Sequence, residues 1–205
     1  MAKIFKNVWF RCISTLLIIA VVSGGLLAIL NDVLYVSAAE RTERAIAKIY
    51  GEKKSVSEEN IIIDVDSSDG SKNKPEKYEF GSVNKLYKIE NDLLFQATGY
   101  KGYKNGTVTL WVLVSGKDGI YSVTKVVLES YEKQTLMSKF GGDYYEGFKL
   151  RDITANYKEG KGYFSANVSD GNQPNTGATY TATAHCNAVN CVIRYVAEKS
   201  AEGAL

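Results

Sequence analysis

A long uncharged segment near the N-terminus constrains this chain more than any other feature. From Cys12 to Leu30 the sequence contains no charged residue and consists mostly of Leu, Ile, Val, Ala and Gly. A membrane-spanning helix needs about 20 mostly apolar residues, whereas the hydrophobic region of a cleaved signal peptide has about 7 to 15. The length therefore predicts one transmembrane helix over residues 12–32.

A cleaved signal peptide is the alternative interpretation of the same segment. Val36-Ser37-Ala38 supplies the small residue that a signal peptidase needs, so cleavage would follow Ala38. No Leu-x-x-Cys motif precedes a usable cysteine, which argues against a lipid anchor at Cys12.

The charges that flank the segment predict its orientation. Lys3, Lys6 and Arg11 precede it, and Asp32 follows it closely. Because basic residues collect on the cytoplasmic side of a membrane helix, residues 1–11 are predicted to be cytoplasmic and the C-terminal domain extracytoplasmic.

The remaining pattern predicts an α+β fold: an antiparallel β meander with flanking helices. Residues 33–51 are expected to form a helical stalk that ends at Gly51, and the turn-forming residues 66–77 to form a surface loop. Runs rich in β-branched and aromatic residues predict strands, and Asp118-Gly119 predicts a hairpin turn. The strands are expected at 86–89, 93–98, 107–115, 120–128 and 162–168, with helical segments at 132–140, 143–150 and 182–201.

Composition excludes two classes of function. Lys plus Arg (25) nearly balance Asp plus Glu (23), so the net charge of +2 gives no nucleic-acid-binding footprint. Three cysteines and one histidine do not suffice for the usual four-ligand structural zinc site. We therefore expect no nucleic acid and no metal.

The reactive side chains near the C-terminus favour structural roles. His185 has no partner in the sequence that would specify a catalytic triad. Cys186 and Cys191 are turned about 140° from each other on a helix, which favours buried thiols over a redox pair.

The most distinctive stretch is Asn175-Thr176-Gly177-Ala178-Thr179-Tyr180-Thr181, just before the predicted C-terminal helix. One interpretation is a helix cap, in which the hydroxyl of Thr179 or Thr181 accepts a backbone N–H. The other is a phosphate site, because a helix N-terminus offers free N–H groups and a partial positive charge. The residues alone leave both open.

Thr176-Gly177-Ala178-Thr179 resembles the Ser/Thr-Gly-Ala-Thr motif of the FMN-binding domain family. The G subunit of the Rnf electron-transport complex and the C subunit of the sodium-pumping NADH:quinone reductase share this domain. The resemblance covers most of the chain: the N-terminal span, the charged stalk, a Gly99-Tyr100-x-Gly102 turn, the meander and the closing helix. The short chain looks closer to the Rnf subunit.

The resemblance implies that Thr179 carries FMN through a phosphoester bond, attached by a flavin transferase of the ApbE type. It implies that residues 52–205 form an extracytoplasmic FMN-binding domain at the cell membrane, working with other membrane subunits of an Rnf-like, ion-translocating complex. The helix start and the Gly177-Ala178 backbone would hold the phosphate. Further cofactor contacts are expected from Thr176, Thr181, Tyr100 and Glu132.

The chain departs from the family pattern at two places. The family usually has Asp six residues before the flavin-bearing threonine, where this chain has Gln173, with Asp170 three residues further upstream. A Glu-Thr-Pro-Gly-Leu-Gly loop is replaced by Glu132-Lys133-Gln134-Thr135-Leu136-Met137. Two alternatives are a standalone extracytoplasmic FMN protein and a flavin-free binding or structural module.

Overall fold

The computed structural model describes the whole chain except residues 1–7, 35–36, 53, 55, 161 and 168–176. Two compact units can be separated, residues 1–42 and residues 43–205, and each is described by itself. The second unit is called the body below.

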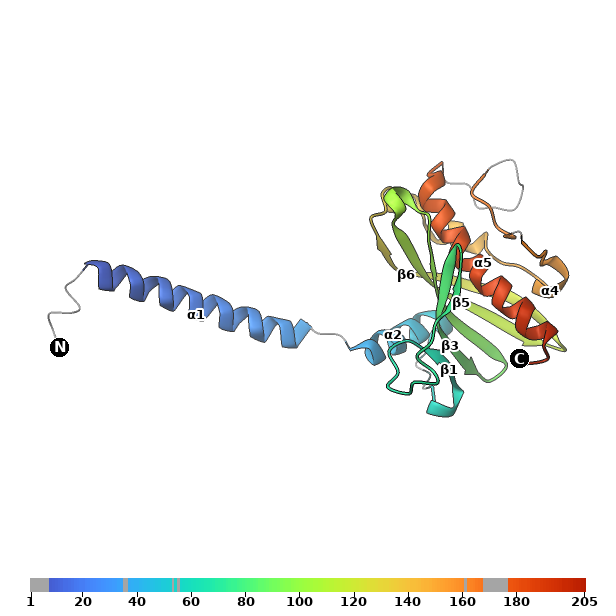
Figure 1. Cartoon of the computed structure of the whole chain (residues 1–205), viewed down its shortest axis with the longest axis horizontal. Helices are drawn as coiled ribbons and strands as arrows, with labels where there is room; N and C mark the ends of the chain where they lie inside the picture. The colour runs from blue at the N-terminus through green and yellow to red at the C-terminus, as the bar shows by residue number, and fades with distance from the viewer. Residues whose placement is uncertain (1–7, 35–36, 53, 55, 161, 168–176) are drawn as a thin grey trace. The chain divides into compact units, whose positions relative to one another are not determined.

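The first unit contains α1 (Val8–Leu34), an apolar helix (Figure 1). Its stretch from Val8 to Asn31 is long and apolar enough to cross a membrane and contains most of the predicted span. Two hydroxyl groups within it bond to the helix itself: Thr15 Oγ1 donates to the Arg11 carbonyl at 2.8 Å, and Ser23 Oγ donates to the Ile19 carbonyl at 2.7 Å. These two bonds suit an apolar surrounding, because each gives a hydroxyl an acceptor within the helix.

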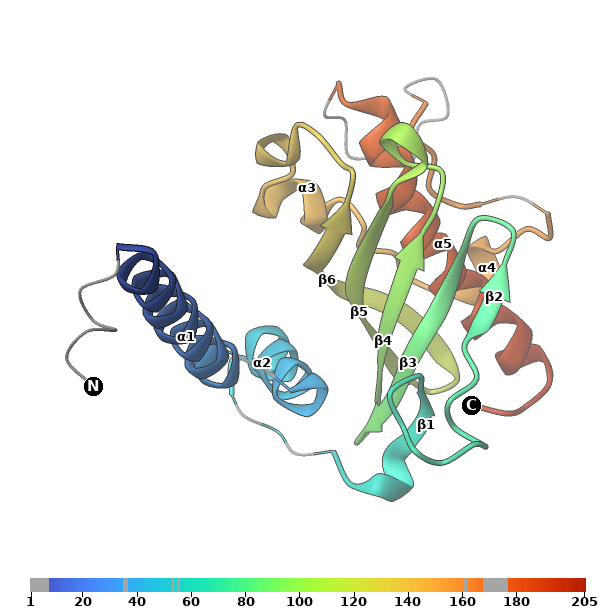
Figure 2. The same cartoon turned by 60° about the vertical axis from the view of Figure 1, so that its left-hand side comes forward.

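An antiparallel sheet forms the centre of the body, in the order β1-β3-β4-β5-β6, with β2 also paired to β3 (Figure 2). The α+β prediction and the meander are confirmed, and the Asp118-Gly119 hairpin joins β5 to β6. The short first two strands were not predicted from the sequence. The strands are β1 (Ile61–Asp64), β2 (Glu76–Tyr78), β3 (Gly81–Ile89), β4 (Asp92–Gly99), β5 (Thr107–Lys117) and β6 (Ile120–Glu132).

Both faces of the sheet are covered, because alternate side chains of each strand point to opposite sides. On one face the core includes Phe95 and Ala97, which pack with residues of the long helix α5 (Thr179–Ala201). On the other face Leu94 and Trp111 pack with residues of α2 (Ala38–Tyr50). The continuous apolar runs of β4 and β5 follow from this double burial.

The end of α2 belongs to the body, which differs from a free stalk. Ile46 and Ile49 are 1% and 4% exposed and contribute to the core on the sheet face. The Lys125 ammonium group donates to the Ile49 carbonyl at 2.7 Å, which binds the helix end to β6. Gly51 ends the helix as predicted: its N–H bonds the Ala47 carbonyl, and its positive φ of 80° turns the chain out of the helix after this bond.

The predicted C-terminal helix 182–201 is confirmed and begins three residues earlier, at Thr179. The two helical segments predicted within 132–150 are shorter than expected, and one predicted strand is wrong. Only η4 (Met137–Lys139) and α3 (Gly142–Glu146) are helical within 132–150, and α4 (Ile153–Asn156) follows. Residues 162–167, the described part of the predicted strand 162–168, are irregular. The Phe164 N–H and carbonyl bond instead to the side-chain amide of Asn190, at 2.9 and 2.8 Å. This single side chain replaces the partner that a strand would need. The remaining short helices are η2 (Glu58–Asn60) and η3 (Tyr103–Asn105).

Candidate functional site

The start of α5 is shaped by Gly177 rather than by a capping threonine. Gly177 has φ of +65°, Ala178 is the N-cap residue, and Thr179 already lies in the helix. The Ala178 side chain makes no capping hydrogen bond, and the prediction that Thr179 or Thr181 is the N-cap is wrong. The physical reason is the left-handed turn at Gly177, which starts the helix before either threonine. The first-turn N–H groups, which have no intrahelical acceptor, therefore receive no oxygen from the side chain of the N-cap residue.

The two described threonines of the motif occupy different environments. Thr181 is 2% exposed, and its hydroxyl donates to the Thr135 carbonyl at 3.2 Å. Thr179 is exposed, and among the described residues its hydroxyl has no hydrogen-bond partner, although its carbonyl accepts from Thr183 Oγ1 at 2.9 Å. Of these two threonines, only Thr179 therefore has a hydroxyl that is accessible for modification. Thr176, Gln173 and Asp170 lie outside the described residues.

A buried histidine forms a hydrogen bond with the first turn of α5. His185 Nδ1 lies 2.9 Å from the Thr181 carbonyl, and Nε2 lies 3.2 Å from the Tyr145 hydroxyl. A carbonyl only accepts, so Nδ1 carries the proton and Nε2 accepts from Tyr145. The Phe140 ring stacks on the imidazole with centroids 4.4 Å apart. Burial lowers the His185 pKa to about 4, so the ring is neutral at pH 7.

Tyr144 completes the aromatic wall beside His185. Its ring meets the imidazole edge-on at a centroid distance of 5.4 Å. Burial raises the Tyr144 pKa well above its ordinary value. Among the described residues its buried hydroxyl has no hydrogen-bond partner, an uncommon state for a buried polar group.

The structure places Tyr100 and Glu132 at the same end of the sheet as the start of α5. Tyr100 follows β4; its carbonyl accepts from the Asn187 side chain of α5 at 2.9 Å, and its hydroxyl donates to Ser82 Oγ at 3.2 Å. Glu132 ends β6, and its exposed carboxylate pairs with Lys133 at 3.3 Å. Among the described residues, no polar contact joins the Glu132 carboxylate to α5. Only the loop that follows it reaches the helix, through Thr135.

Sequence reasoning missed the role of this loop. Gln134 joins the end of β6 to the β4–β5 turn: its Oε1 accepts from the Tyr103 N–H at 3.0 Å, and its Nε2 donates to the Glu132 carbonyl at 2.9 Å. Backbone strain gathers at this end, as it does around functional sites. The non-glycine residues with positive φ here are Lys101, Lys104, Asn105, Lys133 and Leu136.

Large apolar side chains are exposed beside Thr179. Leu136 is 53% exposed and Tyr180 is 70% exposed. The Thr181–Thr135 hydrogen bond joins the two segments that carry these residues, since each is the sequence neighbour of one partner. Large exposed apolar side chains on joined segments are typical of a surface that binds a ligand or a partner.

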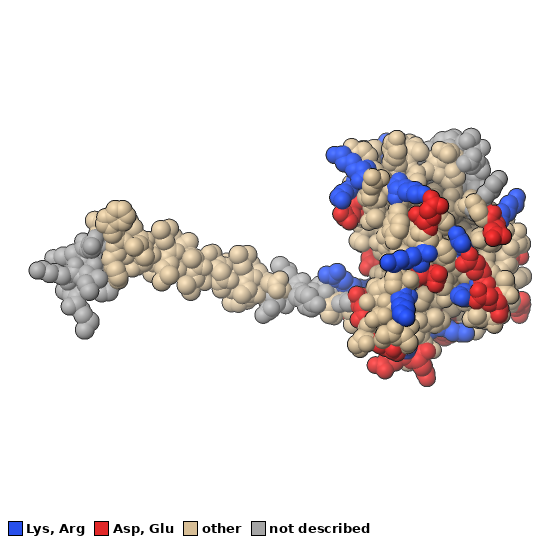
Figure 3. All heavy atoms as spheres, viewed as in Figure 1, with Lys and Arg blue, Asp and Glu red and all other residues tan. Residues whose placement is uncertain are grey.

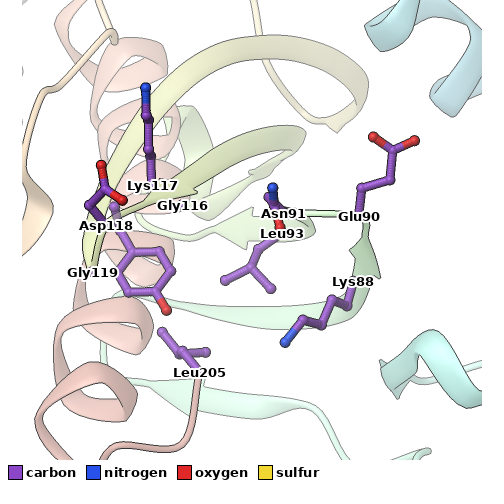
Figure 4. A pocket seen from close by; sticks show the side chains of 10 residues that line it. Lys88, Glu90, Asn91, Leu93, Gly116, Lys117, Asp118, Gly119 and Leu205 are labelled. Atoms are coloured by element: carbon purple, nitrogen blue, oxygen red, sulfur yellow. The ribbon is translucent and has the colours of Figure 1, made fainter.

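Two cavities lined by described residues lie away from the start of α5. One, of about 190 Å³, lies between the β3–β4 and β5–β6 turns, where Lys88, Lys117, Tyr121 and Leu205 line it (Figure 4). A shallow groove of about 720 Å³ follows β6 beside Lys149–Asp152. Neither contains a predicted site residue, and the described residues contain no cluster of three potential metal ligands.

The cysteines of α5 are buried free thiols. Cys186 and Cys191 form no disulfide and are 2% and 0% exposed. Burial raises the Cys186 pKa to about 12 and raises that of Cys191 as well. A thiol with a raised pKa is a poor nucleophile, which agrees with the structural interpretation.

Comparisons with models of protein families, with curated proteins and with solved structures find no match to this chain.

Proposed function

We propose that this protein is a membrane-anchored flavoprotein that relays electrons through FMN attached by a phosphoester bond to Thr179. The observation that carries the proposal is the state of Thr179: an exposed hydroxyl without a described hydrogen-bond partner, in the first turn of a helix whose N-cap residue is Ala178. The neighbouring Thr181 hydroxyl is buried and engaged. The motif resemblance and this difference in availability support the same residue.

The helix start suits the phosphate of FMN. First-turn N–H groups and the helix dipole stabilise an anion. A methyl group built on Gly177 would meet no atom within 4 Å, so the space beside this residue is open. The main chain at the turn therefore has room for a phosphoryl group on Thr179.

The surroundings also suit the flavin ring. Leu136 and Tyr180 offer exposed apolar surface next to the attachment point, where a flat aromatic ring would bury area. FMN supplies the one- or two-electron chemistry when it is bound, and this chain positions it. A covalent bond prevents loss of the cofactor outside the cell.

The proposed setting is the outer face of the cytoplasmic membrane, with α1 as a single-pass anchor and residues 1–11 in the cytoplasm. The partners are the other membrane subunits of an Rnf-like complex and a flavin transferase of the ApbE type. A standalone extracytoplasmic FMN protein would use the same chemistry with different partners. A flavin-free binding or structural module is the other alternative, and the covalent flavin content of the protein distinguishes it from the proposal.

In-gel fluorescence after coexpression with a flavin transferase tests the attachment. The wild-type band is expected to fluoresce on a denaturing gel, and Thr179→Ala to abolish the signal. Thr183→Ala is the control, because Thr183 is a half-buried threonine one turn further along the same helix whose hydroxyl already donates to the Thr179 carbonyl. Thr181→Ala is expected to keep the flavin. Fluorescence that persists in Thr179→Ala would overturn the assignment.

A further inference from the structure

We infer that the exposed surface around the start of α5 is a docking site for an acidic electron-transfer protein. This docking surface comprises Leu136 and Tyr180 at its centre and Lys101, Lys104, Lys133 and Lys139 around them. The inference rests on the proposed function, since it names the partner that would exchange electrons with a flavin on Thr179.

The composition of the surface is that of a protein interface. Three large apolar side chains are exposed at the end of the sheet where α5 begins. They are Tyr131, Leu136 and Tyr180, which are 52%, 53% and 70% exposed. Interface centres are enriched in aromatic residues and are surrounded by a polar rim. Flavin would cover part of this apolar surface, so the lysine rim carries the recognition of the partner.

The charge of the rim specifies the partner. Lys101 pairs with Glu79 at 2.8 Å, and Lys133 pairs with Glu132. Lys104 and Lys139 form no ion pair with any described residue; the Lys104 ammonium lies 5.5 Å from the Tyr103 ring centroid. The α5 dipole adds partial positive charge. In Figure 3 the blue spheres of Lys and Arg side chains lie at the upper left of the body. An acidic surface is the electrostatic complement of a lysine rim.

The backbone that holds the rim is fixed in the free protein. Gln134 ties the β6 end to the β4–β5 turn, and the Gly102 N–H bonds the Gly106 carbonyl at 3.0 Å within that turn. Lys104 and Lys133 are therefore held on joined segments. Preorganised charges lose less entropy on binding and steer a partner of opposite charge toward the site.

The exchange balances as follows. A reduced flavin gives up two electrons and two protons, and the protons pass to water. Two molecules of a one-electron carrier each accept one electron. The reverse transfer reduces the flavin and takes up two protons.

Two probe proteins of opposite charge test the inference on the full chain in detergent micelles: oxidised plastocyanin, which is acidic, and oxidised cytochrome c, which is basic. The test variant is Lys104→Glu/Lys139→Glu. Its matched control is Lys88→Glu/Lys117→Glu at the opposite end of the sheet, where no predicted flavin contact lies (Figure 4). Covalent flavin fluorescence is measured on every variant before kinetics.

At low ionic strength the reduced wild-type protein is expected to transfer electrons faster to plastocyanin than to cytochrome c. The test variant should lower the plastocyanin rate about tenfold, and the control variant should not. High salt should remove the difference. Equal rates for the test and control variants would overturn the inference.

Carbodiimide cross-linking gives a second readout that needs no flavin. Amide cross-links from plastocyanin carboxylates are expected on Lys104, Lys133 and Lys139, and not on Lys88 or Lys117. Cross-linking of all five lysines to the same extent would overturn the docking site. Absence of covalent flavin in the wild type would instead count against the proposed function, while the cross-link positions would still decide the docking surface.

Discussion

At the scale of single residues, His185 links the start of α5 to the body. Its neutral ring bonds the Thr181 carbonyl and the Tyr145 hydroxyl at once, and Phe140 covers one face. The sequence predicts a structural role for His185. The residues that contact its ring could not be predicted, because they lie on segments that only the fold brings together. Protonation of His185 would place a positive charge among buried apolar side chains. It would also turn Nε2 from a hydrogen-bond acceptor into a donor.

Stability is therefore expected to fall in mild acid. The folded-state pKa of His185 is about 4 and the ordinary value is 6.5. The unfolded state binds the proton first, so the stabilising contribution is complete above pH 6.5 and is lost as the pH falls toward 4. The loss approaches about 3 kcal/mol. Urea unfolding of the wild type and of His185→Phe between pH 4.5 and 7.5 measures it. An equal pH slope in the two proteins would contradict the assignment.

At the scale of elements, the chain before α5 shows why one predicted strand failed. Residues 162–168 have strand-like composition, but composition does not provide a neighbouring strand. Asn190 instead bonds both main-chain groups of Phe164. The β3 to β6 strands were predictable, because hairpins bring sequence neighbours together. β1 and β2 are short and flank a polar loop, so their sequence signal is weak.

Asn190→Ala is expected to destabilise the body by about 2 to 4 kcal/mol, because it leaves a buried N–H and a buried carbonyl without partners. Asn187→Ala is the matched control on the same helix. Asn187 bonds only the Tyr100 carbonyl and is half-buried, so about 1 kcal/mol is expected. Chemical unfolding measures both. Similar losses in the two variants would show that the Phe164 bonds contribute little.

The end of α2 contributes to stability in a way that a free stalk would not. Ile46→Ala is expected to cost about 2 to 5 kcal/mol, the usual range for removing a buried aliphatic side chain from a core. Lys48→Ala, at an exposed position two residues along the helix, is expected to change stability by less than about 0.5 kcal/mol. Thermal unfolding followed by circular dichroism distinguishes them. A small effect of Ile46→Ala would place α2 outside the cooperative unit.

At the scale of the whole molecule, the candidate site is assembled from three distant parts of the sequence. The motif around Thr179 was recognisable because its residues are contiguous. The partner loop was not, since Gln134 and Thr135 act through main-chain contacts that leave no residue pattern. The exposure of Thr179 and the burial of Thr181 likewise depend on where the helix begins. That point is determined by the backbone turn at Gly177.

The whole-molecule prediction concerns membrane topology and the fate of the N-terminus. The Ser37 hydroxyl accepts the Glu40 N–H at 3.1 Å, and the Ser37 carbonyl accepts the Arg41 N–H at 3.0 Å. Ser37 therefore caps α2. The peptide bond after Ala38, the alternative cleavage site, lies within the first helical turn, whereas a protease needs an extended segment. This local structure leads us to predict that α1 is retained as an anchor.

We expect the purified protein to keep its native N-terminus and to remain in the membrane fraction after alkaline extraction. A reporter that is active only outside the cytoplasm should be active when it is fused after residue 205, because basic residues such as Lys3, Lys6 and Arg11 favour the cytoplasmic side of a membrane helix. Lys3→Glu/Lys6→Glu/Arg11→Glu removes that bias and should lower the reporter signal. A soluble product that begins at Ala39 would refute the anchor, and an inactive reporter on an intact, membrane-bound chain would reverse the orientation.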